Sequence, residues 1–247
     1  MNKLLVICGP TATGKTALAA KLAKTLSGEL ISADSRQVYR GNDLETNKGR
    51  PNIPIWLYDV ADSGEEFSVS HWVKLAREAM KDIQTRGKLP IVVGGSGLYI
   101  NALLHPFETI DVPPDKTLRD KKLTLGELQK MVQRGSMNDS DWNNPRRLIR
   151  KIEIAQGKHL RGDSLQVQKD IVIIGLTAPL PILYKHIDMR LKERIDAGMK
   201  AQPTNEHSIA RKQMTWFKKQ KDIHWFDCTS PTLQGDVIYL IRHVSKN

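Results

Sequence analysis

The chain is 247 residues long, which allows one large α/β domain, or such a domain with a small appendage, and a full core without disulfides or metal ions. Its hydrophobic content of 40% and charged content of 26% are ordinary for a globular protein, and no apolar run approaches the ~20 residues of a membrane-spanning helix. The net charge of +11, with the excess of lysine and arginine in the second half, favours a polyanionic partner, nucleic acid first.

The first predicted element is a buried strand over 3–8, a short apolar run that leads into a glycine-rich loop. The loop reads Gly-Pro-Thr-Ala-Thr-Gly-Lys-Thr over 9–16 and fits the phosphate-loop pattern G-x-x-x-x-G-K-[ST] without a mismatch; strong helix formers follow over 17–24. Backbone N–H groups and the helix N-terminus would hold a di- or triphosphate, with Lys15 on the phosphates and the Thr16 hydroxyl on a Mg²⁺ ion. The residues predicted to bind the phosphates are Gly9, Pro10, Thr11, Ala12, Thr13, Gly14, Lys15 and Thr16.

Asp34 is a candidate catalytic residue at the end of the second predicted strand, 29–34. It lies in the polar segment Ser-Ala-Asp-Ser-Arg-Gln-Val-Tyr over 32–39, and the carboxyl ends of strands in an open α/β sheet face the ligand crevice. A carboxylate there could bind Mg²⁺ through water or act as a general base. The alternative is an Asx turn or a helix cap, but the polar neighbours beside a phosphate loop favour a functional role.

Strands and helices alternate along the rest of the first half. We expect a third strand over 56–60, a helix over 68–86 with Ser68 as its N-cap and Gly87 as its end, a fourth strand over 88–93, a glycine-rich turn over 94–97 and a helix over 98–104. The glycines of the turn allow close approach of the backbone to a ligand. No acidic residue ends the strand over 88–93, which argues against a motor-type or switch-type nucleoside triphosphatase.

The amino-acid composition of the chain changes after Pro106. Residues 107–143 carry two adjacent prolines and many charges, which predicts a small helical insertion with its clearest helix over 123–133. The elements expected after it are a helix over 146–156 opened by Pro145, a strand over 171–176, helices over 181–198 and 207–219, a short strand over 223–226 and a helix over 236–244. The alternation predicts an α/β fold, a parallel sheet with helices on both faces. Its core would span 1–106 and be completed by 144–247.

Two of these helices are strongly basic. The helix over 146–156 begins with Arg146, Arg147, Arg150 and Lys151, and the second helix carries Arg211, Lys212, Lys218 and Lys219 around Trp216 and Phe217. Arg147 and Lys151 are i,i+4 neighbours on one helix face, an arrangement that suits contacts to a phosphate backbone. Aromatic side chains among cations can stack on bases, but packing in the core is the favoured role of Trp216.

Five segments are informative as a set: the phosphate loop over 9–16, the polar segment over 32–39, Gly-Gly-Ser-Gly-Leu-Tyr over 94–99, Asn-Pro-Arg-Arg over 144–147 and Arg-Lys-Gln-Met-Thr-Trp-Phe over 211–217. In this order, and over nearly the whole chain, they resemble the motifs of tRNA dimethylallyltransferases. That family transfers a dimethylallyl group from dimethylallyl diphosphate to N6 of the adenosine on the 3′ side of the anticodon in tRNA. The resemblance implies a phosphate-loop sheet with a small, reduced helical lobe, Mg²⁺ as cofactor, and both tRNA and dimethylallyl diphosphate as partners.

The resemblance also implies roles for particular residues. Asp34 would be the general base that takes the N6 proton, and Thr11 would hydrogen-bond near the bridging oxygen of the diphosphate. Gly14, Lys15 and Thr16 would hold diphosphate and Mg²⁺, so the loop would bind a leaving group and not a nucleotide. The residues implied to contact tRNA are Asp34, Ser35, Arg36, Gln37, Ser96, Arg119, Asn144, Pro145, Arg146, Arg147 and Leu148.

The chain resembles a shortened member of the family. The usual members carry a longer helical stretch between the positions of residues 198 and 211, and that stretch could supply a basic residue of the diphosphate site. Cys8 and Cys228 are the only two cysteines, so at most one disulfide could form, and the N-terminus leads directly into the first strand without a basic and apolar leader. Both observations favour a cytoplasmic protein, and we also expect a monomer.

Other functions stay open at this point. A small-molecule or nucleoside kinase would share the loop, the sheet and Mg²⁺, with ATP or another nucleotide bound in the loop, but would give the basic helices no role. An enzyme that prenylates free adenine nucleotides would not need a tRNA surface either. The non-enzyme alternative is an RNA-binding protein without catalysis.

Overall fold

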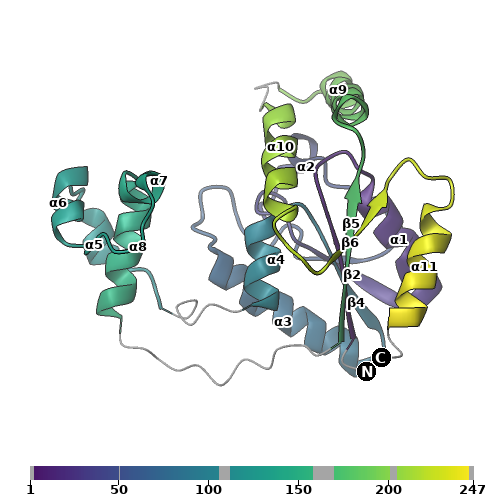
Figure 1. Ribbon diagram of the computed structural model, residues 1–247, viewed down its shortest axis with the longest axis horizontal. Helices are drawn as coiled ribbons and strands as arrows, with labels where there is room; N and C mark the ends of the chain where they lie inside the picture. The colour runs from purple at the N-terminus through teal and green to yellow at the C-terminus, as the bar shows by residue number, and fades with distance from the viewer. Residues whose placement is uncertain (1–2, 50, 106–111, 158–169, 201–204, 245–247) are drawn as a thin grey trace. The chain divides into compact units, whose positions relative to one another are not determined.

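The computed structural model describes residues 3–49, 51–105, 112–157, 170–200 and 205–244. The chain divides into two compact units, the first formed by residues 1–105 and 167–247 and the second by residues 106–166. The first unit contains a six-stranded, all-parallel sheet with strand order β3-β2-β4-β1-β5-β6 (Figure 1). The predicted α/β class with a parallel sheet is confirmed.

The sheet is built from short apolar strands: β1 (Lys3–Cys8), β2 (Gly28–Ser32), β3 (Ile55–Trp56), β4 (Leu89–Val93), β5 (Asp170–Thr177) and β6 (Ile223–Asp227). The central strand β1 lies between β4 and β5, with Ile7 opposite Val93 on one side and Ile174 on the other. Because both faces of the sheet are covered, the strand from Leu4 to Cys8 is buried throughout.

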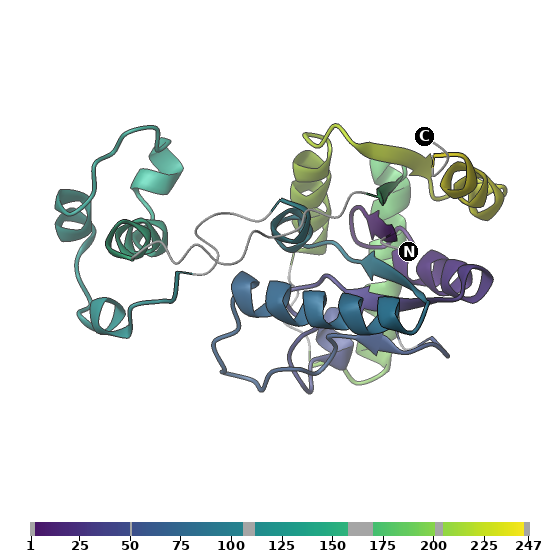
Figure 2. The ribbon, with the colours of Figure 1, turned by 90° about the horizontal axis from the view of Figure 1, so that it is seen from below.

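Helices cover the two faces of the sheet. On one face lie α1 (Lys15–Leu26) and α11 (Leu233–Val244); on the other lie α3 (Val69–Thr85), α4 (Gly97–Leu104) and α10 (Glu206–Phe217) (Figures 1 and 2). Apolar residues of α1 and α11, such as Leu22 and Ile241, pack with strand residues such as Leu5 and Val172 in one core cluster. The described residues contain no helix long and apolar enough to cross a membrane.

The predicted boundaries of α3 are confirmed, and their local causes are visible. The Ser68 hydroxyl accepts a hydrogen bond from the His71 N–H, and the His71 side chain accepts one from the Ser68 N–H, which forms a capping box. Gly87 follows the helix with a φ of 70°, in the left-handed region that a glycine adopts without strain.

In the first unit one predicted strand is too long and one short helix was missed. The strand expected over 56–60 ends at Trp56, because Leu57 and Asp59 have positive φ angles that interrupt extended backbone. The short helix α2 (Asp43–Thr46) was not predicted, since four residues are too few for helical periodicity to be recognised.

The second unit contains four helices within residues 112–157: α5 (Lys116–Asp120), α6 (Leu125–Lys130), α7 (Asp139–Trp142) and α8 (Pro145–Gln156). The helix expected over 123–133 is the shorter α6. The expected division, with the core resuming at residue 144, is also wrong, because α8 belongs to the second unit. Leu148 and Ile152 of α8 pack with Leu118 and Leu128 in a separate core cluster.

A buried carboxylate supports the first unit at β2. The Glu29 side chain, only 7% exposed, accepts hydrogen bonds from Arg86, from Lys88 at 2.7 Å and from the Trp56 indole at 2.9 Å. The hydrogen bonds from Arg86, against the opposing effect of burial, hold the pKa of this carboxyl well below its ordinary value of 4.5.

We expect Glu29→Gln to lower the free energy of unfolding by about 2 kcal/mol at pH 7, since charge-assisted hydrogen bonds to a buried group are removed. A group with a depressed pKa in the folded state stabilises above its unfolded pKa, so the difference should shrink as the pH falls below about 4.5. Urea unfolding at pH 7 and pH 4 measures this, with the exposed Glu78→Gln on α3 as control. A difference between the variants that grows on acidification would contradict the assignment.

Candidate active site

The candidate site is a cavity of about 560 Å³ at the carboxyl edge of the sheet. The loops that follow β1, β2 and β4 all reach this edge: Gly94 N–H donates to the Ile7 carbonyl at 3.1 Å, and Ser96 N–H donates to the Ala33 carbonyl at 3.1 Å. The phosphate loop, Asp34 and the second glycine-rich turn therefore line one cavity, as expected for an open parallel sheet.

The phosphate loop has the conformation that its glycines predict. Gly9 has a φ of 131°, and a Cβ there would lie 2.3 Å from the Leu176 carbonyl oxygen of the neighbouring strand. Gly14, with a φ of 75°, turns the chain into α1. Within the loop the Thr13 hydroxyl donates to the Pro10 carbonyl at 2.9 Å. Residues Thr11, Ala12, Gly14, Lys15 and Thr16 line the cavity at the N-terminus of α1.

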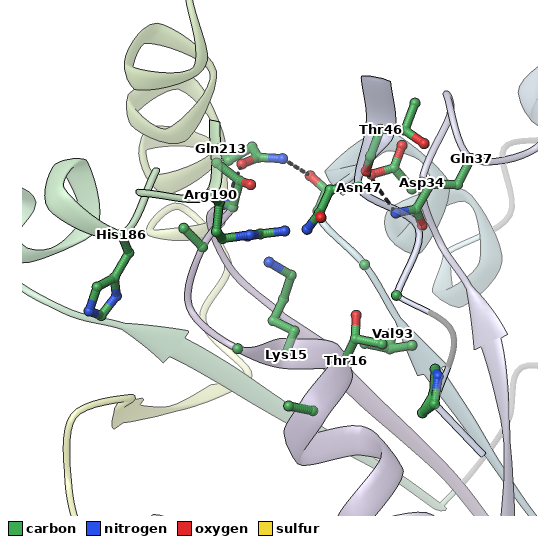
Figure 3. Close-up of a pocket in the computed structure, with 18 of the residues that line it drawn as sticks. Lys15, Thr16, Asp34, Gln37, Thr46, Asn47, Val93, His186, Arg190 and Gln213 are labelled. Atoms are coloured by element: carbon green, nitrogen blue, oxygen red, sulfur yellow. Dashed lines mark hydrogen bonds between the residues drawn. The ribbon is translucent and has the colours of Figure 1, made fainter. Parts of the chain in front are cut away.

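Two cations lie together beside this loop. Lys15 and Arg190, the latter on α9 (Leu180–Asp196), both line the cavity, and Figure 3 shows them pointing toward the same space together with Asn47. Burial, followed by the charge of Arg190, lowers the pKa of Lys15 from 10.5 to about 8. Two adjacent cations in a partly buried cavity form a site for a polyanion, because an anionic ligand relieves their mutual repulsion.

Asp34 faces the same cavity from the loop after β2. Its Oδ1 accepts a hydrogen bond from the Arg36 N–H at 2.9 Å, so the Asx turn that the sequence left open is present. The turn also orients the carboxylate, so that the structural and the functional interpretations of Asp34 are compatible.

Gln213 joins the phosphate loop to the second glycine-rich turn. Its side-chain oxygen accepts from the Thr11 N–H at 2.9 Å, and its amide donates to the Gly95 carbonyl at 3.1 Å. A Cβ on Gly95 would lie 2.4 Å from the Gln213 amide nitrogen, so glycine is needed there for this contact. Trp216, one turn further on α10, packs against Gly97, which confirms its predicted packing role.

The opposite wall of the cavity is held by a buried lysine. Lys48 donates to the Tyr39 carbonyl at 2.6 Å and pairs with Asp59 at 2.5 Å, while its side chain is fully buried. On the same wall Gln37 donates to the Thr46 carbonyl at 3.2 Å. Hydrogen bonds and an ion pair thus connect the segment that contains α2 both to the loop after Asp34 and to the residues before α3.

The residues expected to contact tRNA fall into two groups. Asp34, Ser35, Arg36, Gln37 and Ser96 lie together in the first unit, where Ser35 N–H donates to the Ser96 hydroxyl at 3.0 Å. The others, Arg119 and Asn144–Leu148, lie in the second unit.

In the second unit several of these side chains have structural partners. Asn144 is the N-cap of α8 and accepts from the Arg146 and Arg147 N–H groups, and Pro145 occupies the first turn. Arg119 pairs at 2.8 Å with Glu153, whose side chain is fully buried. Leu148 is also fully buried, and its side chain packs in the core of this unit. Arg146 and Arg147 are exposed, and Arg147 pairs with Asp141.

Asn47, Arg190 and Gln213 are among the cavity residues that the sequence did not indicate. Gln213 lies in the recognised segment over 211–217, which was a usable signal. Arg190 lies in a helix of mixed charge, where nothing distinguishes it from its neighbours. The stretch that is shortened before residue 211 could supply a basic residue of the site in the usual members, and in this chain a basic residue beside Lys15 comes from the preceding helix α9.

A parallel sheet, a phosphate loop before its first helix and a carboxylate across the same cavity define an α/β protein of the phosphate-loop type. Residues 37–203 match the family described as IPP transferase, and residues 2–54 match the family described as isopentenyl transferase. The chain belongs to the tRNA dimethylallyltransferase family and is a prenyltransferase.

Individual relatives agree with this assignment. The chain is 32% identical to the tRNA dimethylallyltransferase of Bacillus cytotoxicus, over 98% of this chain and 95% of that protein. It is 39% identical to tRNA dimethylallyltransferase 2 of Treponema denticola, over 94% and 82%. The crystal structure of the full-length tRNA isopentenylpyrophosphate transferase of Bacillus halodurans aligns with a TM-score of 0.70 at 29% identity, covering 100% of this chain and 99% of that one.

Proposed function

We propose that this protein transfers the dimethylallyl group of dimethylallyl diphosphate to N6 of the adenosine on the 3′ side of the anticodon in tRNA, as a cytoplasmic monomer that uses Mg²⁺. One observation carries the assignment of the reaction to this cavity. Lys15 and Arg190 form a pair of cations beside the phosphate loop, and Asp34 lines the same cavity. A departing anion and a nucleophile that loses a proton require this combination of charges.

The proposed reaction is a displacement at the allylic carbon. The N6 nitrogen forms a bond to C1 of the dimethylallyl group as the C1–O bond breaks, and the bonding electron pair leaves with the diphosphate. Lys15, Arg190 and the N–H groups of the phosphate loop stabilise the negative charge that develops on the leaving group, and Thr11 hydrogen-bonds near its bridging oxygen. The N6 proton passes to the Asp34 carboxylate.

The residues present fit a Mg²⁺ ion held mainly by its substrate. Thr16 lines the cavity at the start of α1, and the described residues contain no cluster of three His, Cys, Asp or Glu side chains that would form an all-protein metal site. Mg²⁺ commonly takes one or two protein oxygens together with phosphate oxygens and water, so the Thr16 hydroxyl and diphosphate suffice. When bound, the ion would neutralise charge on the diphosphate.

The tRNA-binding role extends to Arg146 and Arg147, which are exposed at the start of α8. We expect the double variant Arg146→Ala/Arg147→Ala to weaken tRNA binding and to reduce the slope of log K against log salt by about two, one for each arginine that no longer binds a phosphate. Filter binding between about 50 and 200 mM salt, a range over which such slopes are pronounced, measures this. The exposed pair Lys21→Ala/Lys24→Ala on α1 is the control. An unchanged slope in the arginine variant would show that these arginines of α8 do not bind tRNA phosphates.

The proposed function is tested by incubating the protein with labelled dimethylallyl diphosphate and Mg²⁺, and with either tRNA that reads UNN codons or AMP. We expect label in tRNA at the adenosine beside the anticodon, and none with Asp34→Ala. Label in AMP alone would support the free-nucleotide alternative, and phosphoryl transfer from ATP without prenyl transfer would support a kinase.

A further inference from the structure

Arg194 is a buried cation that does not line the cavity. It lies on the side of α9 that faces the rest of the first unit, and only 5% of the residue is exposed to solvent. Its guanidinium donates to the carbonyls of Leu44 at 3.3 Å and Glu45 at 3.2 Å, and its Nε donates to the Arg190 carbonyl at 3.2 Å. It also forms an ion pair with Glu206 at the start of α10.

These partners belong to three segments that carry cavity residues. Leu44 and Glu45 lie in α2, which leads directly to Asn47, and the Asn47 side chain faces the Arg190 guanidinium. Arg194 itself follows Arg190 by one turn on α9. Glu206 begins α10, which carries Gln213 to the phosphate loop. The Arg194 side chain therefore connects α2, α9, which carries Arg190, and α10, which contacts the phosphate loop through Gln213.

We propose that Arg194 is a positioning residue for prenyl transfer, which holds α2 against α9 so that Asn47 and Arg190 face Lys15. The proposal rests on the proposed function, because it concerns the geometry of the diphosphate site. Carbonyls near the C-terminal end of a helix carry partial negative charge, so a cation is a favourable partner for those of Leu44 and Glu45. The Asn47 side chain, which follows them, in turn contacts Arg190.

The geometry requires arginine at this position. The guanidinium has five N–H donors in a rigid plane, and here they serve three carbonyls and one carboxylate that lie in different directions. A lysine would keep the charge and could reach Glu206, but its single ammonium group cannot satisfy acceptors on both α2 and α9. Arg194→Lys therefore separates the positioning role from the presence of a buried charge.

The test compares Arg194→Lys and Arg194→Gln with Lys192→Gln, an exposed cation on the same helix, by steady-state kinetics with dimethylallyl diphosphate and tRNA. For Arg194→Lys we expect KM for dimethylallyl diphosphate to rise about tenfold, the effect of removing one charge-assisted hydrogen bond, with KM for tRNA unchanged. Hydrogen exchange of the amides over 43–47 should also become faster. Lys192→Gln should match the wild type in every measurement.

The outcomes separate this inference from the proposed function. Wild-type protein that transfers no label to tRNA contradicts the proposed function. Wild-type protein that transfers label, while Arg194→Lys keeps the same KM and has only a smaller fraction of active molecules, overturns the positioning role, since a purely structural residue would have that effect. If Arg194→Gln fails to fold, Arg194→Lys and the exchange at 43–47 decide the question.

Discussion

Asp34→Asn is expected to lower the single-turnover rate of prenyl transfer to tRNA by two to four orders of magnitude, the usual contribution of a general base (~10²–10⁴). Asparagine has nearly the same shape and retains an oxygen that can accept from the Arg36 N–H, so the turn after β2 should persist. The variant can no longer take the N6 proton. Rapid-quench measurement with saturating dimethylallyl diphosphate isolates this step from product release.

Two controls make the result specific to proton transfer. Diphosphate binding by Asp34→Asn should stay within about twofold of the wild type, because asparagine removes no donor to the anion. Asp62→Asn, an exposed carboxylate that pairs with Arg40, should leave the rate unchanged. Equal rates for Asp34→Asn and wild type would remove Asp34 from the chemistry and leave only its structural turn.

The second large effect is expected at Arg190. Arg190→Gln should lower kcat/KM for dimethylallyl diphosphate by about 10²–10³, as removal of a preorganised donor to a developing anion does in other enzymes. Lys185→Gln, an exposed cation on the same helix, is the matched control. A decrease of the same size in both variants would point to a general effect of charge and not to a contact at the leaving group.

The pH dependence of the same variant tests the coupling between the two cations. Lys15 has a pKa of about 8 in the free protein and loses its proton above that pH, so kcat/KM for dimethylallyl diphosphate should fall as the pH rises past about 8. The charge of Arg190 contributes to this lowered pKa, after burial. Arg190→Gln should therefore raise the pKa of Lys15 and move the alkaline decline of kcat/KM to higher pH. A decline at the same pH as in the wild type would show that the charge of Arg190 does not affect the ionisation of Lys15.

The packing of side chains inside the second unit could not be predicted from local sequence patterns. The basic start of α8 was recognised from Pro145 and the arginines after it, and the proline in the first turn is confirmed. The same pattern could not show that Leu148 is buried or that Arg119 serves Glu153, because both facts depend on how α5, α6 and α8 pack. Burial opposes ionisation of Glu153, yet hydrogen bonds from Arg119, the Asp115 N–H and Arg150 hold its pKa below the ordinary value.

The parallel α/β fold, the phosphate loop and the position of Asp34 at the end of a strand could all be predicted from the sequence. These features follow from backbone preferences and hydrophobic periodicity within a few residues, and parallel strands bring their carboxyl ends to one edge. By contrast, the position of Arg190 beside Lys15 and the contacts of Arg194 with three segments around them depend on tertiary packing. Residues so distant in the chain meet because α9 packs against other parts of the first unit, and no local pattern in the sequence specifies that contact.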